Sequence, residues 1–346
     1  MTQSSPLVMK KSACGFLRLI CFNTQNTAQS TVFRHGDLSP QEFFPTDKHK
    51  EVARQHGYGQ LTKLGIQHQY ELGQYMRRRY SHFLSVVYKQ NEIYVQSTDC
   101  DQTLMSAQAS LAGLYPLTQD QIWNPRILWQ PIPVHTVPLS HDNLLYLPFS
   151  RCPRYNELLR ETFAARDFQR QFKHCLNAKY SHYEEKDLFE QNIFCQFFLT
   201  SILTKLIKLS ELLLQAEFGF HKQIQKSRLQ GGILLKTILK HISDARRPSH
   251  QQKMVMYSAH AATIVALQMA LNVFNGKLPP YSACHFFELY QEKNGQYTIE
   301  MYYRNNSLRD PHPLTLPGCK FHCPLERFTH LVSPVLTQHW TRECRI

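Results

Sequence analysis

A repeated order of apolar strand, polar loop and amphipathic helix constrains the fold of this chain more than any other feature. A strand ending over residues 31–33 runs directly into the loop 34–36. A helix is predicted from near Gln60, where apolar side chains recur at spacings of three and four. A strand over 92–95 and a helix from about Gln102 repeat this order. Strands that alternate with helices are typical of an α/β fold.

The rest of the chain continues this alternation around a helical middle. Residues 151–225 are predicted to be mostly helical, because leucines and isoleucines form an amphipathic stripe along them. The dipeptide Asn294-Gly295 favours a tight turn between two strands. Residues 1–30 are polar and aperiodic, so we expect a poorly ordered arm before one large domain over 31–346. Further predicted elements are a helix over 234–242, a strand over 253–257, a helix over 263–274 and strands over 285–291 and 296–303.

The charge of the chain is strongly positive. Its 39 lysines and arginines against 26 acidic residues give a formal net charge of +13, which favours anionic partners. The basic residues are scattered, and no nucleic-acid-binding motif accompanies them, so we expect a diffusely basic surface and no nucleic-acid partner. The apolar runs are far shorter than the roughly 20 residues of a membrane span, so no transmembrane segment is expected.

The cysteines and the N-terminus give opposite indications about the compartment. Cys319 and Cys323 close a tight loop that is either a disulfide or half a metal site, and the disulfide is favoured because no second pair at zinc spacing exists. We therefore predict no metal. Arg18 interrupts the apolar stretch near the N-terminus, which is not typical of a working signal peptide.

The segment 33–40 carries the strongest indication of chemistry. Arg34, His35 and Gly36 lie where a strand ends, with Pro40 shortly after. The imidazole of His35 can attack phosphorus if cations hold the phosphoryl oxygens. Arg34 offers a planar fork for phosphate, and Gly36 permits a close turn. Taken alone, the tripeptide is also compatible with an ordinary loop.

The sequence resembles the vertebrate histidine acid phosphatases from about Thr31 to Cys344. The matching stretches are 43–47 (FFPTD), 57–62 (GYGQLT), 129–136 (WQPIPVHT), 227–232 (SRLQGG), 257–260 (YSAH) and 317–319 (PGC). This resemblance implies an α/β fold with a mixed central sheet, helices on both faces and a smaller, mostly helical insertion near 150–225. It also implies hydrolysis of phosphomonoesters through a phosphohistidine, with no cofactor.

The resemblance assigns roles to individual positions. His35 matches the nucleophile, and Arg34 and His260 match two phosphate-binding residues. The family motif continues Arg-His-Gly-x-Arg-x-Pro, but Leu38 stands where its second arginine would be. Gln96 replaces a further phosphate-binding arginine, and Ala261 replaces the aspartate that protonates the leaving group.

These replacements predict a damaged active site. Leu38 and Gln96 remove two positive charges, and preorganised donors of this kind are worth about 100- to 1000-fold each. Ala261 has no proton to give, and general acid catalysis contributes roughly 100- to 10,000-fold. The residues act as a unit, so the factors do not multiply cleanly. The combined deficit is nevertheless up to about a million-fold. Asp37 is a poor substitute acid because it lies on the nucleophile's own loop.

The resemblance also implies features outside the active site. Disulfides are implied between Cys152 and Cys344 and between Cys319 and Cys323, whereas Cys284 has no sure partner. The relatives are secreted or lysosomal. Asn305 begins a glycosylation sequon, and Trp129 and His135 match residues of a homodimer contact, although packing near a strand end explains them equally well.

Three functions are therefore left open. The sequence favours a pseudoenzyme or near-dead enzyme in which Arg34, His35 and His260 form a remnant anion pocket. The first alternative is a weakly active acid phosphatase that prefers aryl phosphates, whose good leaving groups have little need of an acid. The second is a basic protein that binds nucleic acid or acidic lipid, for which the sequence offers only its net charge.

Overall fold

The computed structural model describes residues 25–40, 57–146, 151–177 and 191–345. A mixed sheet of seven strands lies at its centre, in the order β2-β3-β1-β4-β5-β6, with β7 also paired to β5. β1, β2 and β3 are mutually parallel, and the remaining pairings are antiparallel. The strands are β1 Gln25–Arg34, β2 Ile93–Ser97, β3 Met254–Ala259, β4 Cys284–Gln291, β5 Tyr297–Arg304, β6 His312–Leu314 and β7 Cys323–Pro324.

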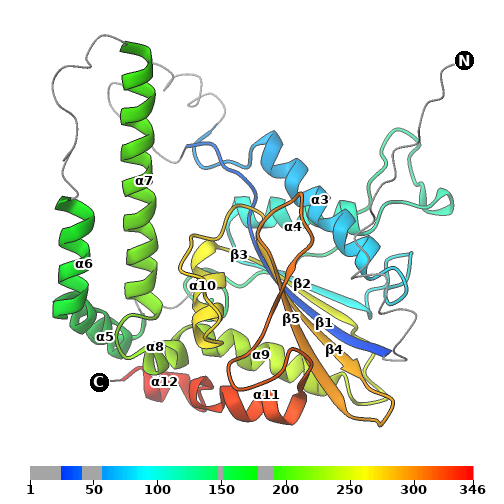
Figure 1. Ribbon diagram of the computed structural model, residues 1–346. Helices are drawn as coiled ribbons and strands as arrows, with labels where there is room; N and C mark the ends of the chain where they lie inside the picture. The colour runs from blue at the N-terminus through cyan, green and yellow to red at the C-terminus, as the bar shows by residue number, and fades with distance from the viewer. Residues whose placement is uncertain (1–24, 41–56, 147–150, 178–190, 346) are drawn as a thin grey trace, which may run out of the picture.

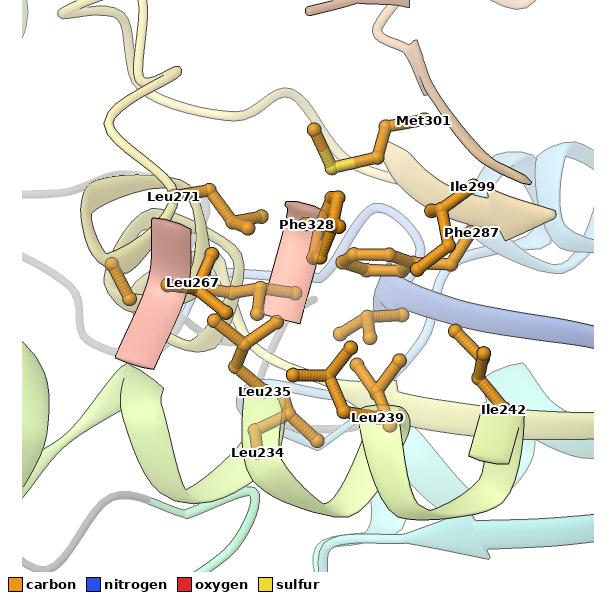
Figure 2. Packing of buried hydrophobic residues seen from close by; sticks show 14 of the residues in the cluster. Leu234, Leu235, Leu239, Ile242, Leu267, Leu271, Phe287, Ile299, Met301 and Phe328 are labelled. Carbon is orange, nitrogen blue, oxygen red and sulfur yellow. The ribbon is translucent and has the colours of Figure 1, made fainter. Parts of the chain in front are cut away.

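Helices cover both faces of this sheet, as the resemblance predicted (Figure 1). Successive strand residues point to opposite faces, so Val32 joins one buried cluster and Phe33 the other. The first cluster lies under α9, α10 and α11, where leucines of α9 pack toward Phe287 and Phe328 (Figure 2). The second lies under α3 and α4. The covering helices are α3 Lys63–Arg79, α4 Asp101–Leu114, α9 Gly231–Asp244, α10 Ala261–Ala270 and α11 Leu325–Val332.

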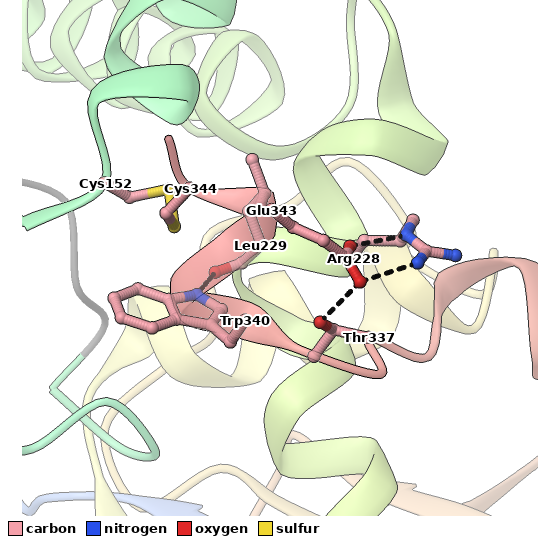
Figure 3. The surroundings of a disulfide bond; sticks show 7 residues. All are labelled: Cys152, Arg228, Leu229, Thr337, Trp340, Glu343 and Cys344. Carbon is pink, nitrogen blue, oxygen red and sulfur yellow. Dashed lines mark hydrogen bonds and ion pairs between the residues drawn. A yellow bond between two sulfur atoms is a disulfide. The ribbon is translucent and has the colours of Figure 1, made fainter. Parts of the chain in front are cut away.

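A mostly helical lobe lies beside the sheet, between α4 and α9 in the chain (Figure 1). Short helices η1 Gln119–Gln121, η3 Ser333–Val335 and α12 Trp340–Glu343 lie outside it. Figure 3 shows how the C-terminal segment is tied to the lobe: the disulfide Cys152–Cys344 joins the residue before α5 to the residue after α12, and Arg228 pairs with Glu343. The lobe contains α5 Pro153–Ala164, α6 Arg166–Asn177, α7 Gln191–Phe218 and α8 Gln223–Leu229.

The start of β1 differs from the sequence prediction. Residues 25–30 were expected in a poorly ordered arm, but they form the first half of a central strand. Two of their polar side chains, Gln29 and Ser30, are fully buried: Ser30 Oγ lies 3.0 Å from His241 Nδ1, and Gln29 Nε2 donates to Asn26 Oδ1 at 2.6 Å. Hydrogen bonds to other residues of the protein therefore hold these buried polar side chains. A buried strand is usually recognised in a sequence by apolar residues, which are absent from this stretch apart from Ala28. The remainder of the expected arm, residues 1–24, lies outside the described residues.

Other predicted elements agree with the structure except at their ends. The two disulfides implied by resemblance, Cys152–Cys344 and Cys319–Cys323, are confirmed. Cys284 is a buried free thiol. The helix predicted over 263–274 ends earlier, since Asn272 takes a left-handed φ of 53°. No helix in the described ranges is long and apolar enough to cross a membrane.

Candidate functional site

The carboxyl ends of three parallel strands meet at one edge of the sheet. Arg34 of β1 pairs in register with Ala259 of β3, and Ser97 of β2 pairs with Ser258. The residues that follow these strand ends, among them His35 and His260, therefore gather at the same edge. Open α/β sheets commonly bind ligands in this position.

The His35 ring is held in one tautomer by its own loop. His35 Nδ1 lies 2.9 Å from the carbonyl oxygen of Gly36. A carbonyl only accepts hydrogen bonds, so Nδ1 carries the proton and Nε2 keeps its lone pair. Burial, and then the charge of Arg34, lowers the pKa of His35 to about 4. The ring is therefore neutral in mildly acidic solution, the state in which Nε2 is a nucleophile.

Two glycines let the His35 loop approach α3 closely. A Cβ atom on Gly36 would lie 2.5 Å from the carbonyl oxygen of Gly65, and one on Gly65 would lie 2.3 Å from the carbonyl oxygen of Asp37. The Gly36 amide donates to Ser106 Oγ of α4 at 3.0 Å. The loop is thus fixed between two helices, which sets the direction of the His35 side chain.

Arg34 is the charged group nearest to His35, and its own partners are neutral. Its Nη1 donates to the carbonyl oxygen of Pro279 at 2.6 Å, and its guanidinium carbon lies 4.0 Å from the ring centroid of Tyr281. In the described part of the chain no carboxylate forms an ion pair with Arg34. Burial lowers the pKa of Arg34 from its usual value, although an arginine stays charged. The negative charge of Asp37 acts on Arg34 only at a distance, without an ion pair, so this largely buried cation still favours an anionic ligand.

His260 lies beside His35, as the resemblance predicted for two residues of one site. Their ring centroids are 5.7 Å apart in an edge-on arrangement. His260 Nε2 lies 3.0 Å from Thr98 Oγ1, and the Tyr146 ring lies 5.8 Å away. Burial, followed by the charges of His35 and Arg34, lowers the pKa of His260 to about 4. Near neutral pH the pair of histidines is uncharged.

The positions of the three replaced residues are well defined. Leu38 forms an isolated bridge with Leu61, and Gln96 bridges to His135 from within β2. Ala261 is the first residue of α10, directly after His260.

Asp37, predicted from the sequence to be a poor substitute acid, has a hydrogen-bonded carboxylate. Its Oδ2 accepts a hydrogen bond from Thr62 Oγ1 at 2.7 Å, at the N-terminus of α3. The Asp37 carboxylate is therefore engaged with the helix cap.

Several residues of the site were not identified from the sequence. Tyr281 covers Arg34 and lies 5.6 Å from the His35 ring, and Tyr146 flanks His260. Tyrosines in loops give no periodic pattern, so no local signal identifies them. Thr98 follows Gln96 by two positions, but the resemblance assigned a role only to Gln96. No group of three or more potential metal ligands occurs among the described side chains.

Comparisons with known proteins agree with this geometry. The family model described as the histidine phosphatase superfamily (branch 2) matches residues 18–304. Prostatic acid phosphatase from Bos taurus is 50% identical over 335 residues, covering 91% of this chain and 86% of the relative. The Homo sapiens protein of that name is 48% identical over 372 residues, with coverage of 99% and 96%. Lysosomal acid phosphatase from Rattus norvegicus is 44% identical, with coverage of 91% and 79%.

Solved structures support the fold at much lower identity. The phytase from Citrobacter braakii superposes with a TM-score of 0.59 at 17% identity, covering 93% of this chain and all of the other. A multiple inositol polyphosphate phosphatase from Bifidobacterium longum gives a TM-score of 0.62 at 13% identity, with coverage of 97% and 95%. At these identities the likeness concerns the fold alone.

Proposed function

The chain belongs to the histidine phosphatase superfamily (branch 2), and on that premise we propose that it is an acid phosphatase-like protein whose phosphohistidine chemistry is severely impaired or lost. The family reaction is phosphomonoester hydrolysis, and His35 is the residue that would become phosphorylated. The observation that carries the proposal is the charge of the site: near neutral pH, Arg34 is the only cation assigned to it among the described residues.

The first chemical step requires an attack on phosphorus and stabilisation of the oxygens around it. His35 Nε2 has the free lone pair for the attack, because Nδ1 is bound to Gly36. Negative charge on the transferring phosphoryl group would meet Arg34, whereas Leu38 and Gln96 supply no positive charge. Preorganised cations are the largest contribution in this class of reaction, so their loss slows attack.

The same step also needs a proton for the departing alkoxide. Ala261 begins α10 with a methyl group where the family has a carboxylic acid. Asp37 is hydrogen bonded to Thr62. His260 has a pKa of about 4, so only a minor fraction of it carries an acidic proton at pH 5 or above. An alkyl phosphate, whose leaving group is poor, should therefore react most slowly of all.

A weakly active phosphatase that prefers aryl phosphates is the second candidate. It is favoured by the intact nucleophile, by the 50% identity to a prostatic acid phosphatase and by the low acid requirement of an aryl leaving group.

Hydrolysis of an aryl phosphate at about pH 5 separates the two candidates. The purified wild-type chain is compared with His35→Ala, and an alkyl phosphate is run in parallel. Turnover equal to that of His35→Ala on both substrates supports the pseudoenzyme. Turnover of the aryl ester that disappears in His35→Ala means that the reaction survives, and it contradicts complete loss.

Binding is the function that remains if turnover is absent. Arg34, with His35 and His260 when they are protonated, forms an anion pocket for a phosphomonoester or another small anionic ligand. A broadly basic surface that binds lipid or nucleic acid instead predicts binding that falls steeply with salt and is insensitive to the Arg34→Gln substitution.

We also retain two proposals about the intact protein. A homodimer through Trp129 and His135 is compatible with Trp129, which is 41% exposed, and with His135, which stacks on Tyr94 at 4.8 Å between ring centroids. Asn305 follows β5 and is exposed, so a glycan on it would not disturb the core. Sedimentation velocity tests the dimer, with Trp129→Ala expected to give the monomer. Mass spectrometry of chain secreted from a eukaryotic host tests the glycan.

A further inference from the structure

Two buried threonine hydroxyls lie next to His260. Thr98 Oγ1 is 3.0 Å from His260 Nε2 and 2.7 Å from Thr103 Oγ1. Both threonines are fully buried. Thr98 follows β2, and Thr103 lies in the first turn of α4. The two side chains therefore connect His260, which follows β3, to the neighbouring strand and helix.

The number of available protons determines which group donates in each of these hydrogen bonds. Thr103 Oγ1 lies 3.0 Å from the carbonyl oxygen of Thr98 and 2.9 Å from that of Cys100. Carbonyl oxygens only accept, and a hydroxyl has a single proton, so the Thr103 proton is used there. In its contact with Thr103, Thr98 must then be the donor. The single hydroxyl proton of Thr98 is thus donated to Thr103, so Thr98 can only accept a hydrogen bond from His260.

This direction determines which nitrogen of His260 carries the proton. If Thr98 accepts, His260 Nε2 is the donor, and Nδ1 of the neutral ring has only a lone pair. The same residue is the N-cap of α10, where its backbone N–H donates to Thr263 Oγ1 at 3.4 Å and its side chain makes no cap hydrogen bond. A neutral His260 therefore has no second N–H to offer an anion.

We propose that Thr98 and Thr103 are positioning residues that hold neutral His260 as the Nε2–H tautomer, so that His260 joins anion binding only after it has taken up a proton. The inference rests on the proposed function, because it assigns the regulation of the same pocket. Anion binding by His260 is then coupled to proton uptake, because the ring can donate to the ligand only when Nδ1 is protonated.

The groups that face His260 determine how acidic the solution must be. Arg34 and His35 face it from the end of β1, and both disfavour a positive charge on its ring. Tyr146 flanks it from the segment that precedes α5. Cys100 hydrogen bonds to Thr98, and the first turn of α10 contains no acidic residue. Among the residues that the structure describes, no carboxylate is therefore assigned to assist protonation, and phosphate binding should strengthen as the pH falls toward about 4.

The tautomer is measured directly by ¹⁵N NMR of the histidine rings. The His260 signals are assigned by their absence in His260→Gln. In the wild type we expect a protonated Nε2 and an unprotonated Nδ1. Thr103→Val keeps the shape of the side chain but frees the Thr98 proton to point at Nε2, so the tautomer should shift toward Nδ1–H. Thr98→Ser, which retains the hydroxyl, should match the wild type. A wild-type ring protonated on Nδ1, or no shift in Thr103→Val, overturns the proposal.

Titration with inorganic phosphate at pH 7 tests the consequence for binding. Thr103→Val should bind phosphate about tenfold more tightly than the wild type, because Nδ1–H adds one charge-assisted hydrogen bond. Equal affinity in a variant whose tautomer has shifted overturns the link to binding. If no variant binds phosphate while the tautomers behave as expected, the anion pocket of the proposed function fails and the positioning role of the threonines stands. If Thr103→Val does not fold, the wild-type and Thr98→Ser tautomers still decide.

Discussion

The guanidinium carbon of Arg34 lies 4.0 Å from the ring centroid of Tyr281, so the one assigned cation of the site is covered by an aromatic face. A cation over an aromatic ring gains about 0.5–1 kcal/mol at sites that are partly exposed. The Tyr281 ring is 39% exposed. Tyr281 thus stabilises Arg34 when no anion is bound, and an arriving phosphate competes with that contact.

Removing the Tyr281 ring should therefore strengthen phosphate binding. Tyr281→Leu is expected to raise the affinity by about two- to fivefold, the equivalent of the lost cation–π contact. Tyr281→Phe keeps the aromatic face and serves as the matched control, with affinity close to that of the wild type. Calorimetric titration with inorganic phosphate measures both. Weaker binding by Tyr281→Leu would mean that the ring supports the ligand rather than competing with it.

Restoring the replaced residues should revive the reaction. The triple variant Leu38→Arg, Gln96→Arg and Ala261→Asp returns two cations and one acid to the site. Its turnover of an alkyl phosphate should exceed that of the wild type by at least about 1000-fold, given the contributions of such groups. Adding His35→Ala to the triple variant should abolish the gain. A well-folded triple variant without any gain contradicts the explanation of the defect.

The buried histidines should make the protein labile to acid. His285 is fully buried, and neither ring nitrogen has a hydrogen-bond partner in the described part of the chain. Burial lowers its pKa to about 3, from 6.5 for an exposed ring. Between these values the unfolded chain binds more protons than the folded one, so stability is complete above pH 6.5 and is lost as the pH falls toward 3.

Replacing His285 tests this account. His285→Phe fills the site without titrating, and should raise the melting temperature more at pH 5 than at pH 7.5. The ring stacks on Phe287 at 4.6 Å between centroids, so Phe287→Leu is a suitable control. That control should lower the melting temperature by a similar amount at both pH values. An unchanged pH dependence in His285→Phe would show that His285 does not cause the acid lability.

The two disulfides should differ in their contribution to stability. Cys152–Cys344 spans 192 residues of sequence and Cys319–Cys323 only 4. The loop-entropy relation gives roughly 5 kcal/mol for the long loop and roughly 2 kcal/mol for the short one. Denaturant unfolding of Cys152→Ala/Cys344→Ala and of Cys319→Ala/Cys323→Ala should show this order. A larger loss in the second variant would mean that local packing outweighs chain entropy here.

The sequence by itself determined the class of fold and placed Arg34, His35 and Gly36 at the end of a strand. The periods of strands and helices depend on which side chains are apolar. The hairpin turn depends on Gly295, because its backbone adopts a positive φ of 80°. The tripeptide at His35 and the family motifs are contiguous, so they are readable without coordinates. The spacing of Cys319 and Cys323 already favoured a disulfide, whereas the Cys152–Cys344 pair was implied only by the resemblance.

Only the tertiary structure decided what surrounds the nucleophile. The polar start of β1 is part of a central strand in which the buried Ser30 finds a partner in His241, 211 positions away, which no local pattern records. Thr98 meets His260 across 162 positions of sequence, and Arg34 lies against Tyr281 across a longer interval still. Hydrogen-bond direction, tautomer and pKa depend on these distant neighbours. These neighbours come together only when the parallel strands align their carboxyl ends, and that alignment is a property of the folded chain.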